Sequence, residues 1–204
     1  MITGIIVSYN TTTLLRNCVQ SFKKYYPNNP LIIIDGSPRG SQCFRLAQSF
    51  YKGNTIVKCV EYNIGHGNGM KLGITMVQTS HFALIDSDTV IKGQVFEQME
   101  KYLASNVYGV GKIVKVDKRG GNSENGIDYL HPYFAVINKQ LYLKHLPIIH
   151  HGAPMLNAMV SLSMQKEHSI INFSKIDDYV LHLERGTRVL KPTEFHPKTW
   201  QAVL

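Results

Sequence analysis

Two aspartates that stand one residue apart are the side chains in this sequence best suited, by type and spacing, to bind a metal ion. Asp86 and Asp88 flank Ser87 and directly follow the apolar run 82–85. Carboxylates in this arrangement can share a divalent cation such as Mn²⁺ or Mg²⁺, because these ions accept carboxylate and phosphate oxygens as ligands. An Asx turn that leaves a strand contains the same residue types. Whether the two aspartates indicate a metal site therefore depends on the elements around them.

Polar residues also follow the three other apolar runs in the first half of the chain. They are Ser8, Tyr9 and Asn10 in and after the first run (2–8), Asp35 after the second (31–34) and Asn63 after the third (56–62). Short apolar runs without polar alternation are typical of parallel strands that are covered on both faces. Ligands of such sheets bind at the carboxyl ends of the strands, so we expect all these residues to meet at one edge.

Amphipathic patterns that are typical of helices separate these runs. Apolar residues fall on one stripe within 14–22, and further stripes occupy 46–50, 70–77 and 95–103. A strand–helix alternation of this kind implies right-handed crossovers. We therefore predict an α/β fold with a Rossmann-like, mostly parallel central sheet, within one domain of 204 residues.

The second half of the chain is less regular. The predicted elements are strands over 107–116 and 133–137, a polar glycine-rich loop over 118–126, and further strand candidates over 170–176 and 179–183. A helix is predicted from Ala153 onward, with Pro154 in its first turn, where the missing N–H of proline is tolerated.

The composition is that of an ordinary globular protein with a basic balance. Hydrophobic residues make up 44% and charged residues 18% of the chain, and the formal net charge is +8. This charge favours anionic partners such as nucleotide diphosphates, nucleic acid or an anionic membrane surface, without selecting one. The short N-terminal apolar run lacks the features of a signal peptide, and no run approaches the roughly 20 residues of a membrane span. We therefore expect a cytoplasmic protein with no transmembrane segment.

Cysteine spacing indicates neither a disulfide framework nor a zinc site. Cys18, Cys43 and Cys59 form no CxxC pair, and each lies among apolar neighbours. We expect them to fill the core as small apolar side chains.

A glycine-rich loop precedes the third helical pattern. It contains Asn63, Gly65, His66, Gly67 and Asn68. Glycines before a helix let backbone N–H groups approach an anion, and the helix dipole favours negative charge there. A flexible connection between strand and helix explains the composition equally well. The loop is neither a Walker motif nor a dinucleotide fingerprint after the first strand.

Four of these segments, in their order along the chain, resemble the motifs of family 2-like glycosyltransferases with the GT-A fold. They are Val7-Ser8-Tyr9-Asn10, Ile34-Asp35-Gly36-Ser37, Asn63 to Gly69, and Asp86-Ser87-Asp88. The resemblance covers about the first half of the chain and implies metal-dependent sugar transfer from a nucleotide-sugar donor. A UDP-sugar is the first expectation for the donor and a GDP-sugar the second. The acceptor would be a glycan or another hydroxyl compound, and the cofactor Mn²⁺ or Mg²⁺.

The same resemblance implies roles for single residues. On the donor side these are Ser8, Tyr9, Asn10 and Asp35 against the nucleotide, and Asn63 with the following Gly65, His66, Gly67 and Asn68 bordering the donor. Asp88 would be the metal ligand proper, and Asp86 would share the metal site while lying closer to the ribose. Residues 1–105 would thus bind the donor, and 106–204 would build the acceptor side of a single domain, 1–204.

A late segment resembles the part of GT-A enzymes that completes the metal and diphosphate site. His182 would be a further metal ligand, since neutral imidazole binds ions of the Mn²⁺ type. Arg185 and Arg188 would contact phosphate through their planar guanidinium groups. A surface strand end with solvated arginines is an equal alternative.

The acceptor side departs from the family pattern. Inverting members usually carry two carboxylates at the start of an acceptor-side helix, but the equivalent segment, 150–154, contains no acid. His151 is a substitute candidate for the general base, because imidazole titrates near neutral pH. Asp177 and Asp178 are rival carboxylates, and we predict Asp178, together with His151, as a catalytic candidate. A retaining mechanism, which needs no such base, stays open.

Two other classes of function compete with this interpretation. A nucleotidyltransferase of sugar phosphates uses a related sheet, but it needs a basic glycine-rich loop where Ser8 to Thr11 stand. A catalytically silent module that binds nucleotide or glycan would explain the missing acid. An acceptor made of modified DNA is permitted by the net charge and would show steep salt dependence, although no base-reading residues are evident.

Overall fold

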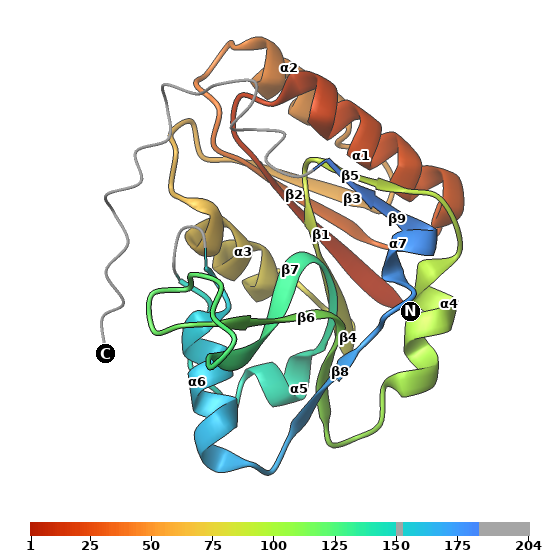
Figure 1. Cartoon of the computed structure of the whole chain (residues 1–204). Helices are drawn as coiled ribbons and strands as arrows, with labels where there is room; N and C mark the ends of the chain where they lie inside the picture. Colours follow the sequence, from red (N-terminus) through yellow and green to blue (C-terminus); the bar gives the residue numbers. More distant parts are fainter. Residues whose placement is uncertain (150–152, 184–204) are drawn as a thin grey trace.

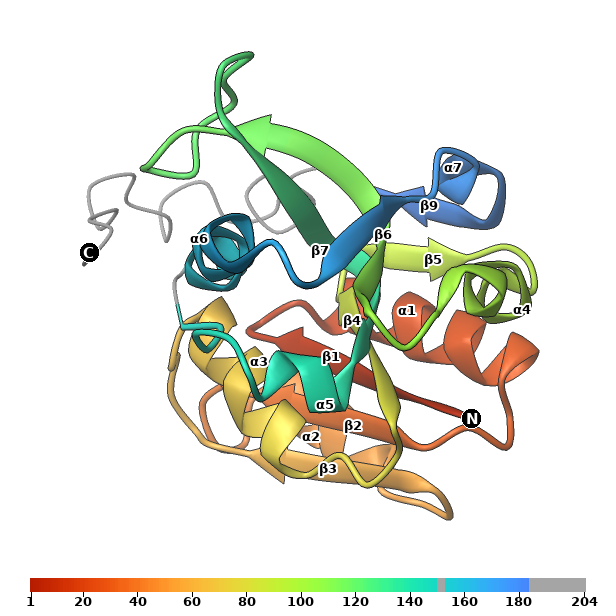
Figure 2. The same cartoon turned by 90° about the horizontal axis from the view of Figure 1, so that it is seen from below.

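The computed structural model describes residues 1–149 and 153–183, which form a seven-stranded sheet with helices on both faces (Figures 1 and 2). The first half of the chain contains β1 (Ile2–Ser8), α1 (Thr12–Tyr25), β2 (Leu31–Asp35), α2 (Gln42–Ser49), β3 (Thr55–Cys59), α3 (His66–Thr75) and β4 (His81–Asp86). It is followed by β5 (Thr89–Ile91), α4 (Val95–Met99), η1 (Glu100–Tyr102), β6 (Val107–Val116), β7 (Ile127–Asn138), α5 (Lys139–Tyr142), α6 (Leu156–Gln165), β8 (Ser169–Asn172), α7 (Ile176–Tyr179) and β9 (Val180–His182).

The first four strands form the parallel part of the sheet. The strand order is β3-β2-β1-β4-β7-β6-β8, and β1 pairs in parallel with both β2 and β4. β7 runs antiparallel to β4 and to β6, while β8 pairs in parallel with β6. This order confirms the predicted α/β fold with a mostly parallel central sheet. It also puts the carboxyl ends of β1 to β4 at one edge, where ligands of such sheets bind.

Both faces of the sheet are buried, which explains the absence of polar alternation in its strands. On one face, α1, α2 and α4 cover a cluster that includes Ile6 and Ile33. On the other face, α3, α5 and α6 cover a cluster that includes Ile5 and Ile34. Successive residues of a strand point to opposite faces, so neighbours in β1 and β2 serve different clusters. Each such isoleucine stabilises the fold by about 1.5–3 kcal/mol when fully buried.

The approach of α3 to β1 requires glycine at two positions. A Cβ on Gly69 would lie 2.6 Å from Val7 Cγ1, and a Cβ on Gly73 would lie 2.5 Å from Ile5 Cγ2. A larger residue at either position would push the helix away from the sheet, because packed side chains have little room to yield. The two glycines are one helical turn apart and face β1. His66, the first residue of α3, lies on the same face of the helix, near the carboxyl edge of the sheet.

The structure corrects two predicted strands. The strand predicted over 56–62 is β3, which ends at Cys59; β3 lies at the edge of the sheet, and Glu61 has a φ of 64°. The strand predicted over 133–137 is β7, which extends from Ile127 to Asn138. Residues 127–130 of this extension pair with β6 in a hairpin, and Asp128, His131 and Pro132 keep the extension from forming an apolar run.

Two boundaries near the C-terminal end of the described chain also differ from the prediction. The helix predicted from Ala153 begins at Leu156, so Pro154 precedes it. The strand predicted over 170–176 ends at Asn172, and Ile176 begins α7 instead. Ile176 is buried in the cluster beneath α1 and α4, and this burial explains its apolar character without a strand.

The cysteines are free thiols, and Cys18 and Cys43 are buried as predicted for core residues, whereas Cys59 is half-buried. Across residues 1–149 and 153–183, every helix is too short or too polar to cross a bilayer.

Candidate functional site

A cavity of about 720 Å³ opens at the carboxyl edge of the parallel strands. The residues of its wall that the sequence predicted for the site are Ser8, Tyr9, Asn63, Gly65, His66, Asp86, Asp88 and His182. They come from the ends of β1 and β4, from the loop before α3 and from β9. The predicted meeting of distant strand ends at one edge is therefore present in the structure.

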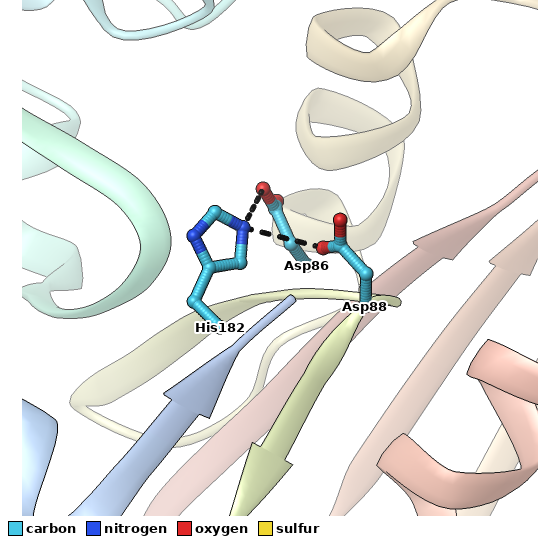
Figure 3. A group of neighbouring side chains, drawn as sticks. All are labelled: Asp86, Asp88 and His182. Atoms are coloured by element: carbon cyan, nitrogen blue, oxygen red, sulfur yellow. Dashed lines mark ion pairs between the residues drawn. The ribbon is translucent and has the colours of Figure 1, made fainter. Parts of the chain in front are cut away.

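Asp86, Asp88 and His182 point toward one another at this wall (Figure 3). His182 Nε2 lies 3.3 Å from Asp88 Oδ1 and 3.9 Å from Asp86 Oδ2. One donor atom from each residue lies within 4.8 Å of the other two. Two carboxylates and one imidazole at this spacing are a donor set that fits Mn²⁺ or a similar ion.

The pairing of two short strands brings His182 to the aspartates. β5 begins at Thr89, directly after Asp88, and pairs antiparallel with β9 so that Thr89 lies opposite His182. The backbone N–H of Leu183 donates to the carbonyl oxygen of Asp88 at 3.0 Å. The ring of His182 also stacks on Tyr133, with centroids 4.5 Å apart and planes inclined by 15°. The position of His182 is thus fixed from both its backbone and its ring.

Histidines surround the carboxylate of Asp86 and act on its pKa. His66 Nε2 lies 3.0 Å from Asp86 Oδ1. Burial acts to raise the pKa of Asp86, but the charges of His66, His131 and His182 outweigh burial and hold this pKa below its usual value. Burial also acts to lower the pKa of His66, yet the carboxylate of Asp86 outweighs it and raises this pKa. For His131, by contrast, burial prevails and the pKa is lowered.

Asp35 lies beneath the wall of the cavity and not on it. Its side chain is fully buried, and its Oδ1 accepts hydrogen bonds from Ser8 Oγ at 2.6 Å and from Ser37 Oγ at 2.8 Å. The backbone N–H of Asn10 donates to Ser37 Oγ at 2.9 Å, and Asn10 is likewise outside the cavity lining. Asp35 and Ser37 therefore hold the turn after β1 in place, and through it Ser8 at the wall.

The glycine-rich loop contributes part of its predicted set to the wall. Asn63, Gly65 and His66 line the cavity, whereas Gly67 and Asn68 lie within the first turn of α3. Asn63 Oδ1 accepts a hydrogen bond from the backbone N–H of Gly65 at 2.9 Å. Gly65 has a φ of 80°, a conformation that favours glycine. The loop is thus a hydrogen-bonded turn that aims the first residue of α3 into the cavity.

The two carboxylates predicted for the acceptor side differ in position. Both are exposed, but Asp177 lines the cavity whereas Asp178 lies outside its lining. Lys112 Nζ lies 3.3 Å from Asp177 Oδ2, and the hydroxyl of Tyr133 donates to Asp177 Oδ1 at 3.4 Å. Adjacent residues of a helix are about 100° apart around its axis, so the two side chains point in different directions. The geometry thus favours Asp177 over the predicted Asp178.

Two lysines at the cavity were not predicted. Lys92 Nζ donates to the carbonyl oxygen of Asp177 at 2.8 Å, and Lys112 pairs with its carboxylate. Lys112 is the first polar side chain after the apolar part of β6, and this change in pattern could have indicated a residue of the site. Lys92 follows β5, and no sequence pattern distinguishes it. The predicted His151, Arg185 and Arg188 lie outside the described residues.

The family model described as Glycosyl transferase family 2 matches residues 3–161 of the chain. This match covers well over half of the 204 residues, and the chain therefore belongs to glycosyl transferase family 2. The predicted family and class of enzyme are confirmed. A comparison with curated proteins finds no match.

Solved glycosyltransferase structures share the fold. The mannosyltransferase PcManGT from Pyrobaculum calidifontis, in complex with GDP-Man and Mn²⁺, has a TM-score of 0.64 and 13% identity over 84% of this chain and 54% of that chain. TarS 1–349 from S. aureus, in complex with UDP-GlcNAc, has a TM-score of 0.60 and 16% identity over 83% of this chain and 56% of that chain.

A third structure is covered more fully. Glucosyl-3-phosphoglycerate synthase from Mycobacterium tuberculosis, in complex with Mn²⁺, UDP and glucosyl-3-phosphoglycerate, has a TM-score of 0.63 and 12% identity, over 93% of this chain and 74% of that chain. By contrast, the chain spans little more than half the length of PcManGT and of TarS 1–349. These similarities show the GT-A fold.

Replacing Asp88 by asparagine removes one carboxylate charge and keeps the shape of the side chain. We expect Asp88→Asn to weaken Mn²⁺ binding by at least about 100-fold, because losing a direct ligand exceeds the 10–100-fold cost of losing a supporting residue. Calorimetric titration with MnCl₂ measures the change. The control Asp128→Asn removes an exposed aspartate that pairs with Lys115 outside the cavity lining. Equal Mn²⁺ affinity of the two variants would contradict the metal site.

Proposed function

We propose that the chain is the catalytic domain of a metal-dependent glycosyltransferase that moves a sugar from a nucleotide-sugar donor to an acceptor hydroxyl. The observation that carries this proposal is the convergence of Asp86, Asp88 and His182 on the wall of a cavity of about 720 Å³. A cavity of this size suits a small organic ligand. In a family 2 chain, a metal donor set beside such a cavity is best explained by a bound nucleotide diphosphate.

The chemistry of the donor set favours Mn²⁺ over Mg²⁺. Imidazole nitrogen is a good ligand for transition metals, whereas Mg²⁺ prefers oxygen ligands and keeps several waters. The complexes of PcManGT and of the Mycobacterium tuberculosis synthase contain Mn²⁺, which supports this choice. Bound between Asp86, Asp88 and His182, the ion would neutralise the charge that develops on the departing diphosphate.

We assign the nucleotide to the first half of the chain, residues 1–105, and the acceptor to residues 106–204. Ser8, Tyr9 and Asn63 border the cavity on the donor side. Asp35 supports Ser8 from below, so its contribution to donor binding would be indirect. A UDP-sugar is the first candidate and a GDP-sugar the second; TarS was solved with UDP-GlcNAc and PcManGT with GDP-Man.

On the acceptor side we propose Asp177, in place of Asp178, as the proton acceptor of an inverting transfer. Lys112 and the hydroxyl of Tyr133 hold the carboxylate of Asp177 at the cavity. Tyr133 also stacks on His182, so one side chain connects this carboxylate with the metal donor set. A carboxylate placed there can accept the proton of the acceptor hydroxyl as that oxygen attacks the sugar.

Donor binding is tested by calorimetric titration with a panel of UDP-, GDP-, CDP- and dTDP-sugars. We expect micromolar binding of one donor in the presence of Mn²⁺ and its loss in EDTA, because the ion bridges the diphosphate and the carboxylates. Release of the nucleoside diphosphate from that donor would then establish turnover. Binding without any release would favour the catalytically silent module, and no metal-dependent binding of any donor would contradict the proposal.

The neighbouring aspartates of α7 allow a matched test of the proton acceptor. With the donor identified above and an acceptor found by screening, Asp177→Asn should lower kcat by about 100-fold or more, the usual contribution of general base catalysis. Its donor affinity should stay unchanged. Asp178→Asn serves as the control and should keep kcat, because Asp178 is exposed outside the cavity lining. Full activity of Asp177→Asn would dismiss Asp177 as the base.

A further inference from the structure

The two oxygens of Asp86 have different surroundings. Oδ1 is buried and lies 3.0 Å from His66 Nε2. Oδ2 lies on the side of His182, at 3.9 Å from His182 Nε2, where Asp88 also converges. His66 therefore contacts the oxygen of Asp86 that does not take part in the closest approach to His182.

The packing of α3 explains why His66 can make this contact. His66 is the first residue of α3 and stands three residues before Gly69, which faces Val7 of β1 at a distance that permits no side chain. Residues three apart lie on the same face of a helix. The close approach of helix and sheet thus extends along this face to His66. Asp86 lies at the end of β4, next to β1, and so within its reach.

A carboxylate that is held at one oxygen cannot rotate freely about its Cβ–Cγ bond. The ion pair of His66 Nε2 with Asp86 Oδ1, at 3.0 Å, restrains the plane of the carboxylate and leaves Oδ2 on the side of His182. Contacts of this kind around metal ligands contribute about 10–100-fold to metal affinity, because they orient the ligand before the ion arrives. The Nε2–H that this contact requires is present in the imidazolium and in one neutral tautomer.

We propose that His66 is a positioning residue for the metal site, which holds Asp86 by Oδ1 so that Oδ2 is presented together with Asp88 and His182. This inference rests on the proposed function, because it presumes that a divalent cation binds at those three residues. It gives His66 a task that is separate from any contact with the nucleotide sugar. The glycines of α3 would then affect metal binding, because they determine how near His66 comes to the sheet.

The test is the dissociation constant for Mn²⁺ alone, without nucleotide, read from the EPR signal of free Mn²⁺. His66→Ala should weaken Mn²⁺ binding by about 10–100-fold. His66→Gln should restore most of the affinity, because the amide N–H of glutamine reaches nearly the same place as Nε2–H. The control His81→Gln removes the histidine at the opposite end of β4, beside Ile2 of β1, and should leave the affinity unchanged.

A second pair of variants changes the position of His66 without changing its side chain. Gly69→Ala places a Cβ against Val7 Cγ1 and should weaken Mn²⁺ binding by pushing the start of α3 outward. The double variant Gly69→Ala/Val7→Ala removes the clashing methyl groups and should recover affinity. Val7→Ala alone is the reference for the lost core volume. Circular dichroism and thermal unfolding of each variant show whether the fold is retained.

The outcomes separate this inference from the proposed function. If the unmodified protein binds no Mn²⁺, the metal site and the role of His66 both fall. If it binds Mn²⁺ and folded His66→Ala binds equally well, the metal site stands and the positioning role is overturned. Unchanged Mn²⁺ affinity with a loss confined to nucleotide-sugar binding would likewise overturn it, and would show His66 to be a donor contact.

Discussion

The gathering of two carboxylates at the end of β4 is the constraint on which the rest of the site depends. Asp86 and Asp88 lie at and just after the end of a strand whose preceding residues are fully buried, so two acidic side chains lie close together above an apolar sheet. The histidines around Asp86 outweigh its burial and hold its pKa low. A divalent cation would stabilise the carboxylates more strongly than the histidines do, because it offers two positive charges to both carboxylates at once.

Several distant contacts serve this arrangement. The pairing of β5 with β9 supplies His182, and the close packing of α3 on β1 supplies His66. β7 supplies Tyr133, whose ring stacks on His182 and whose hydroxyl reaches Asp177. The proposed metal donor set and the carboxylate of Asp177 are therefore parts of one connected structure. The buried sheet beneath them gives these polar groups a rigid base, which a site needs if charges are to be held in place before a ligand binds.

Local sequence patterns predicted the parallel half of the sheet, because strands buried on both faces appear as apolar runs and their ends are marked by polar residues. They did not predict the contacts that depend on tertiary packing. Asp128, His131 and Pro132 interrupt the apolar residues of β7, so the start of this strand at Ile127 was missed. Asp177 and Asp178 are equivalent in sequence, and the orientation of α7 alone distinguishes them. The contact of His66 with Asp86 follows from helix packing, which no local pattern records.

The central claim is that a divalent cation and a nucleotide diphosphate share the cavity beside Asp86, Asp88 and His182. Diffraction from crystals soaked with Mn²⁺ and UDP or GDP, measured at the manganese absorption edge, tests it directly. We predict an anomalous peak within bonding distance of oxygens from both aspartates and of His182 Nε2, with diphosphate oxygens on the same ion. A peak at another place, or a nucleotide bound away from this cavity, would contradict the account.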